Sequence, residues 1–82
     1  MKKQAGIIVV DDEESTRELF HTVLSDEGHH VTLANNGDEA LTLFKAGSFD
    51  LVISDIIMPD TDGLQLLQEI RKTGPTVDVI IT

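Results

Sequence analysis

The chain has 82 residues, which is enough for one domain with a small core, and its 40% apolar content argues against disorder. Fifteen Asp and Glu against six Lys and Arg give a formal net charge of −9, so the chain offers no basic patch for nucleic acid or an anionic membrane surface. Without Cys it has no disulfide, thiolate zinc site or Cys nucleophile, and its longest apolar run is too short to span a bilayer.

The first half of the chain alternates between short apolar runs and amphipathic stretches. Residues 7–10 are all β-branched, which predicts a strand that is buried on both faces. The next stretch predicts a helix that ends near Gly28. Four apolar side chains share one face of this helix: Leu19, Phe20, Val23 and Leu24. Residues 31–34 alternate like a half-exposed strand at a sheet edge, and Asp38 can cap a second helix that Gly47 closes.

The second half repeats this alternation. Residues 51–53 predict another buried strand, and residues 59–63 predict a loop. A third helix follows, which is broken at Gly74-Pro75. Its apolar side chains recur at helical spacing: Leu64, Leu66, Leu67 and Ile70. Residues 77–81 predict a fourth strand, so the expected order is βαβαβαβ.

This order predicts an α/β fold with a parallel sheet. Right-handed crossovers restrict its topology. The most apolar strands, residues 7–10 and 51–53, belong in the middle of the sheet, and residues 31–34 belong at an edge. The predicted fold class is a flavodoxin-like parallel sheet of order 2-1-3-4 with helices on both faces. Its topological switch point lies between strands one and three, where ligands bind beyond the carboxyl ends of the strands.

Three acidic residues follow the two central strands at this crevice. Asp11 and Asp12 come after the first strand, and Asp55 comes after the third. Taken alone, the pair could be the solvated start of a helix, and Asp55 could be a turn residue. Three carboxylates at close range repel one another, and a divalent cation removes that conflict. Because hard oxygen ligands suit Mg²⁺, the combination predicts a magnesium site.

Three segments of the chain resemble the receiver domain of two-component response regulators. They are Ile-Ile-Val-Val-Asp-Asp at 7–12, Asp-Ile-Ile-Met-Pro-Asp-Thr-Asp-Gly at 55–63, and the final Val-Ile-Ile-Thr at 79–82. The resemblance implies that Asp55 accepts a phosphoryl group and contributes to a Mg²⁺ site. It also implies that Asp12 binds this ion directly, that Asp11 acts largely through bound water, and that the backbone carbonyl of Ile57 is a further ligand.

The resemblance implies further roles. Thr82 would bind the phosphoryl group in the switch, while Met58, Pro59 and Gly63 would shape the loop after the acceptor. The phosphoryl donor would be a sensor histidine kinase or a phosphotransfer protein, and this chain would be cytoplasmic. The chemistry is at most self-phosphorylation and autodephosphorylation, since a carboxylate can attack phosphohistidine to form an aspartyl phosphate.

The length differs from that of the family. We expect residues 1–82 to be the N-terminal portion of a single receiver domain, without its fifth strand and last two helices. The Lys that the family carries on the fifth strand then has no counterpart, so switching should be poor. Apolar side chains of strands three and four should face water, each losing about 1.5–3 kcal/mol of burial. Strand four should be an open edge, so we expect one of two cases: the chain is a fragment of a longer receiver, or it forms a homodimer or a swapped oligomer.

Two alternative functions stay open at this point. The chain could be an assembly or dimerisation module that is not phosphorylated. Less favoured is a Mg²⁺-dependent phosphatase with an aspartyl nucleophile, because such enzymes of the haloacid dehalogenase type place a second Asp where this chain has Ile57. A nucleotide-binding Rossmann unit is disfavoured because no Gly-rich turn follows the first strand.

Overall fold

A computed structural model describes residues 4–55, 63–74 and 77–81 of the chain. The seven elements follow the predicted order: β1 (Gly6–Val10), α1 (Glu14–Asp26), β2 (His30–Ala34), α2 (Gly37–Ala46), β3 (Leu51–Ser54), α3 (Gly63–Thr73) and β4 (Asp78–Ile81). Within these described ranges, none of the three helices is both long enough and apolar enough to cross a membrane.

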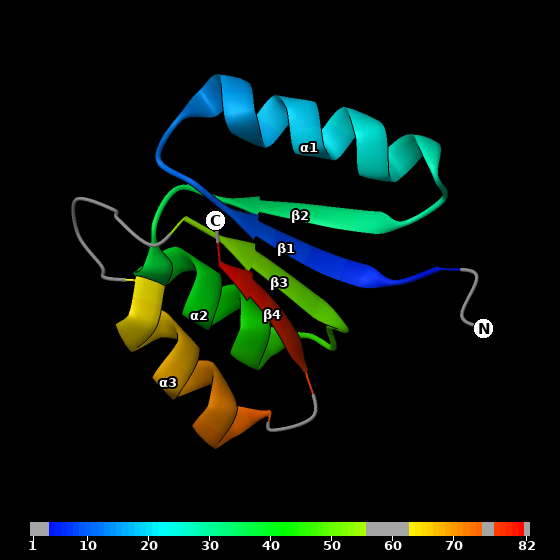
Figure 1. The fold of residues 1–82 in the computed structure, drawn as a ribbon. Helices are drawn as coiled ribbons and strands as arrows, with labels where there is room; N and C mark the ends of the chain where they lie inside the picture. Colours follow the sequence, from blue (N-terminus) through cyan, green and yellow to red (C-terminus); the bar gives the residue numbers. More distant parts are fainter. Residues whose placement is uncertain (1–3, 56–62, 75–76, 82) are drawn as a thin grey trace.

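The four strands form one parallel sheet of order β2-β1-β3-β4, which confirms the predicted topology. Val10 at the end of β1 lies opposite both Ala34 of β2 and Ser54 of β3, and Ser54 lies opposite Ile81 of β4. The carboxyl ends of all four strands therefore meet at one edge of the sheet. Figure 1 shows α1 on one face of this sheet and both α2 and α3 on the other.

The face that α2 and α3 cover contains the larger core. Alternate strand residues point to it, because successive side chains of a strand face opposite ways. They pack with residues from both helices and from the turn before β4, and each member is at most 8% exposed: Ile8, Val10, Ala34, Ala40, Phe44, Val52, Leu66, Ile70 and Val77. Every strand and helix of the described chain except α1 contributes to this core, β4 through the partly buried Val79.

The α1 face is only partly covered. Phe20 and Leu24 pack against Ile7, Val9 and Ile53. The other two residues of the predicted apolar face are not covered, since Leu19 is 63% exposed and Val23 is 52% exposed. Neighbouring residues of a helix point about 100° apart, so the helix rests on one row of side chains while the adjacent row turns away from the sheet.

The exposed row of α1 lies on the flank nearer β3 and β4. His21, on the opposite flank, lines a surface hollow with Leu33 of edge strand β2, and Leu19 and Val23 project the other way. On that side Ile80 of β4 is 49% exposed, as expected from the sequence. On β3, Ile53 is only 7% exposed because side chains of the α1 face cover it, so the expectation of exposure is wrong for this residue, while Leu51 is half-buried.

The helix ends confirm two predicted glycines and correct one predicted cap, and Gly47 is the C-cap of α2 as expected. Gly28, with φ of 92°, follows the end of α1 as predicted, in a Schellman motif. Its N–H donates to the carbonyl of Ser25 at 2.9 Å, and the N–H of His29 donates to that of Leu24 at 3.2 Å. The cap of α2 is Asn36, not Asp38. Its side-chain oxygen accepts from the N–H of Glu39 at 2.8 Å, because its extended backbone places it just before the first helical turn.

Candidate functional site

The structure brings the three predicted carboxylates together at the carboxyl edge of the sheet. Asp11 and Asp55 directly follow Val10 and Ser54, which are register partners in β1 and β3. Each extends the ladder by one bond, from Asp11 N–H to the Ala34 carbonyl and from Asp55 N–H to the Val10 carbonyl, both at 3.2 Å. One carboxylate oxygen from each of Asp11, Asp12 and Asp55 lies within 4.8 Å of the others.

This concentration of negative charge has an electrostatic cost. Asp11 and Asp55 are half-buried and Asp12 is exposed. Partial burial raises the pKa of Asp11 above its ordinary value, and contacts with the other two carboxylates add to this effect. The N–H of Glu13 opposes the shift by donating to Asp11 Oδ1 at 2.9 Å. A divalent cation would relieve the repulsion, and three hard oxygens at this spacing fit the ligand preference of Mg²⁺.

The backbone around the acids is held by two side chains. The guanidinium of Arg17, in the first turns of α1, donates from Nη1 to the main-chain carbonyl of Asp11 at 2.6 Å. The hydroxyl of Ser54, which is 1% exposed, donates to the main-chain carbonyl of Asp55 at 2.9 Å. Asp11 is therefore fixed through its N–H, its carbonyl and its carboxylate.

Sequence reasoning missed both of these supporting residues. The pattern of apolar residues singles out neither Arg17, a polar residue of α1, nor Ser54, the last residue of β3. Each carries a weak signal. An Arg one turn into a helix can reach back to the loop that precedes it, and a Ser at the end of the aliphatic run Leu51–Ile53 needs a hydrogen-bond partner when it is buried.

Several predicted site residues lie outside the part of the chain that the structure describes. These are Ile57, with its proposed metal-binding carbonyl, the loop residues Met58 and Pro59, and Thr82. Gly63 is the first residue of α3. The roles given to these residues stay predictions.

Three comparisons with known proteins bear on this arrangement. The profile of a family described as "Response regulator receiver domain" matches residues 7–82. A probable transcriptional regulator, ycf27, from Cyanidium caldarium is 41% identical over 81 residues, which cover 99% of this chain and 32% of the relative. The chain thus spans about a third of that relative's length.

Two solved structures share the architecture. The response regulator TrrA from Thermotoga maritima, crystallised in complex with Mg(2+)-BeF, is 45% identical with a TM-score of 0.89, and the match covers 94% of this chain and 67% of that one. The beryllofluoride-activated NtrC4 receiver domain, solved in solution as a dimer, is 34% identical with a TM-score of 0.87, covering 93% of this chain and 63% of that one.

Proposed function

The chain belongs to the response regulator receiver domain family, and from this membership we propose that Asp55 is its phospho-acceptor. Accepting a phosphoryl group is the general role of the family. The observation that supports Asp55 is its place in the cluster with Asp11 and Asp12, where carboxylate oxygens from three residues lie within 4.8 Å of one another. The proposal also takes residues 1–82 as the N-terminal portion of a single receiver domain.

In this proposal Asp55 is the nucleophile. One of its carboxylate oxygens attacks the phosphorus of a phosphohistidine, a P–O bond forms, and the P–N bond breaks as the imidazole leaves. Asp11, Asp12 and Asp55 hold Mg²⁺, with the backbone carbonyl of Ile57 as a further ligand. When bound, the ion neutralises the charge that opposes an anionic phosphoryl donor. The Thr82 hydroxyl binds the transferred phosphoryl group.

The donor in this proposal is a histidine on another protein. Receiver domains as a family interact with histidine kinases or phosphotransfer proteins, and we assign this chain the same class of partner. Response regulators are typically cytoplasmic, and we assign this chain that location as well. The reaction is a single self-phosphorylation, followed by slow hydrolysis of the aspartyl phosphate, so the chain is not a turnover enzyme. The apolar side chain of Ile57 is proposed to slow that hydrolysis by limiting the access of water.

The test uses acetyl phosphate, which removes the need for a partner kinase. The chain is incubated with acetyl phosphate and Mg²⁺ and measured by intact mass spectrometry, with Asp55→Asn as the matched variant. We expect an adduct of one phosphoryl group on the wild-type chain, none on Asp55→Asn, and none when EDTA replaces Mg²⁺. A folded wild-type sample without an adduct, or an Asp55→Asn sample with one, would contradict the proposal.

Exposed apolar side chains favour a second candidate, which is assembly through the α1 face. Leu19, Val23 and Ile80 are 63%, 52% and 49% exposed. Such an exposed apolar surface favours pairing with another chain. The similar NtrC4 receiver domain was solved as a dimer.

Sedimentation velocity tests assembly directly. The net charge of −9 on each chain opposes association, so we expect a dimer to become more stable as salt screens that repulsion. Ile80→Lys should shift the population to monomer. A chain that stays monomeric at high concentration in both low and high salt would rule out this second candidate.

A further inference from the structure

We propose that Arg17 is a positioning residue for the carboxylate cluster, acting through the main chain of Asp11. This inference rests on the proposed function, because it takes the cluster as a Mg²⁺ site. Arg17 does not belong to the cluster itself. It lies in α1, six residues after Asp11, and its described contact with the site is the hydrogen bond from Nη1 to the Asp11 carbonyl at 2.6 Å.

The bonded carbonyl has a particular place in the chain. It belongs to the peptide unit that joins Asp11 to Asp12, and a peptide unit is planar. Fixing its oxygen therefore fixes the direction in which the chain enters Asp12. The Asp12 side chain is exposed, so packing does not orient it, and the backbone that carries it must do so. A hydrogen bond with a charged donor is about twice as strong as a neutral one, which suits this task.

The other end of the contact is anchored in the fold. Arg17 is half-buried and lies on the row of α1 that continues three and seven residues later as Phe20 and Leu24. Both of these side chains pack against the sheet beneath the helix. The guanidinium thus connects the loop between β1 and α1, which carries Asp11 and Asp12, to a helix face that is already packed on β1 and β3.

A purely electrostatic role for Arg17 predicts the opposite result from a positioning role. Removing a positive charge near three carboxylates makes the site more negative, so Coulomb attraction alone would strengthen the binding of a cation. Losing the hold on the Asp11–Asp12 peptide would weaken binding, because the ligands must then be ordered when the ion binds. The sign of the change in Mg²⁺ affinity therefore separates the two roles.

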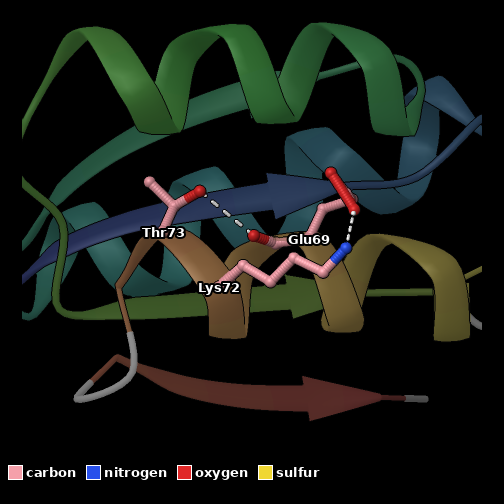
Figure 2. A network of polar contacts seen from close by, with 3 residues as sticks. All are labelled: Glu69, Lys72 and Thr73. Atoms are coloured by element: carbon pink, nitrogen blue, oxygen red, sulfur yellow. Dashed lines mark hydrogen bonds and ion pairs between the residues drawn. The ribbon is translucent and has the colours of Figure 1, made fainter.

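The experiment is a calorimetric Mg²⁺ titration of the full 82-residue chain. Arg17→Met keeps an apolar stem and removes the donor, and Arg17→Gln keeps a polar side chain that is too short for the contact. Lys72→Met is the matched control. Its ammonium forms an exposed ion pair with Glu69 at 3.3 Å on α3, near the end of that helix (Figure 2), so the same charge is removed away from the site.

We expect the dissociation constant for Mg²⁺ to rise about tenfold in both Arg17 variants, which is the usual effect of losing a group that orients metal ligands. Lys72→Met should stay within about a factor of two of the wild type, since exposed pairs contribute little. In amide spectra of the ion-free chain, the Asp12 signal should move in both Arg17 variants and stay unchanged in Lys72→Met. If Arg17 contributed only to stability, its variants would have a lower melting temperature, but the Mg²⁺ dissociation constant and the amide signal of Asp12 would stay unchanged.

Two results would overturn the inference, and they can be told apart. If the folded wild-type chain binds no Mg²⁺, the proposed metal site fails and the role of Arg17 fails with it. If the wild type binds and the Arg17 variants bind as tightly or more tightly, the inference fails alone. Should Arg17→Met not fold, Arg17→Gln decides, because Gln has nearly the same helix propensity as Arg and keeps the position polar.

Discussion

The two faces of the sheet differ in how completely they are covered. Under α2 and α3, Ile8 and Ile70 are fully buried and Leu66 is 2% exposed. Under α1, Phe20 and Leu24 reach the sheet while Leu19 and Val23 point to solvent. The loop from β1 to α1, which carries Asp11 and Asp12, leads into the less covered face. Most of the burial therefore lies on the α2 and α3 side of the sheet, whereas the loop that carries Asp11 and Asp12 leads to the α1 side.

The largest expected effect is a difference between the two faces in how much stability a truncated side chain costs. Ile70→Ala on α3 should cost about 3 kcal/mol of unfolding free energy, because it leaves a cavity in the closed core. Leu19→Ala on α1, a truncation of similar size, should change it by less than about 0.5 kcal/mol, since this side chain is already 63% exposed. Urea unfolding followed by circular dichroism measures both, because the chain has no Trp or Tyr to report by fluorescence.

Equal losses of unfolding free energy in Ile70→Ala and Leu19→Ala would contradict the difference in coverage between the two faces. They would mean that Leu19 is covered in solution, for example by a second copy of the chain. Repeating the measurement over a range of protein concentrations distinguishes this case, because the stability of a dimer depends on concentration and that of a monomer does not.

The fold could be predicted from the sequence because burial and periodicity point the same way in each element. The β-branched run at 7–10 can bury its side chains on both faces only as a central strand. The alternating run at 31–34 has one face that is more polar and suits an edge strand. Once the order of the strands is set, the topology itself brings Asp11 and Asp55 to one crevice. Their proximity follows from the ends of two strands and needs no knowledge of side-chain packing.

The parts that could not be predicted depend on local geometry that periodicity does not contain. Four apolar residues of α1 fit one stripe on a helical wheel, yet the width of the contact with the sheet decides which of them are buried. The choice of Asn36 over Asp38 as cap depends on where the backbone first becomes helical. The hydrogen bond from Arg17 to Asp11 depends on the path of a loop, so the residue type alone gives only a weak hint.

A smaller effect is expected at the end of α1. Gly28→Ala should cost about 1–2 kcal/mol, because φ of 92° places the residue in the left-handed region, where a Cβ is strained. Gly28→Asn should lose less, since Asn tolerates this conformation. If α1 is the more weakly held helix, hydrogen exchange in the Gly28→Ala chain should speed up in α1 before it does in α3. Uniform acceleration in both helices would show that the two faces unfold as one unit.

A comparable loss should follow from removing the cap of α2 on the closed face. Asn36→Ala should cost about 1 kcal/mol, because the N–H of Glu39 loses its acceptor. Asp38→Ala is the control, since its side chain is exposed and does not cap the helix, and it should cost clearly less. Thermal unfolding of the two variants in parallel measures the difference. A larger loss for Asp38→Ala would restore Asp38 as the functional cap.

The smallest effect concerns the charge carried by the acidic loop. Because the pKa of Asp11 is raised in the folded chain, folding favours its protonated form, and the charged form costs stability near neutral pH. Without Mg²⁺, Asp11→Asn should therefore be more stable than the wild type at neutral pH. That advantage should shrink as pH falls through the raised pKa of Asp11, where the wild-type carboxyl becomes neutral as well.

Saturating Mg²⁺ at neutral pH should reverse the order of the two chains, because an ion that binds the folded wild type stabilises it and Asn is a poorer ligand. Unfolding measured across pH in EDTA, and again with Mg²⁺, gives both comparisons. Asp38→Asn, an exposed acid away from the cluster, provides the control and should show neither the pH trend nor the reversal. If Asp11→Asn were less stable than the wild type in EDTA, the carboxylate would stabilise the loop through Glu13 by more than repulsion in the cluster destabilises it.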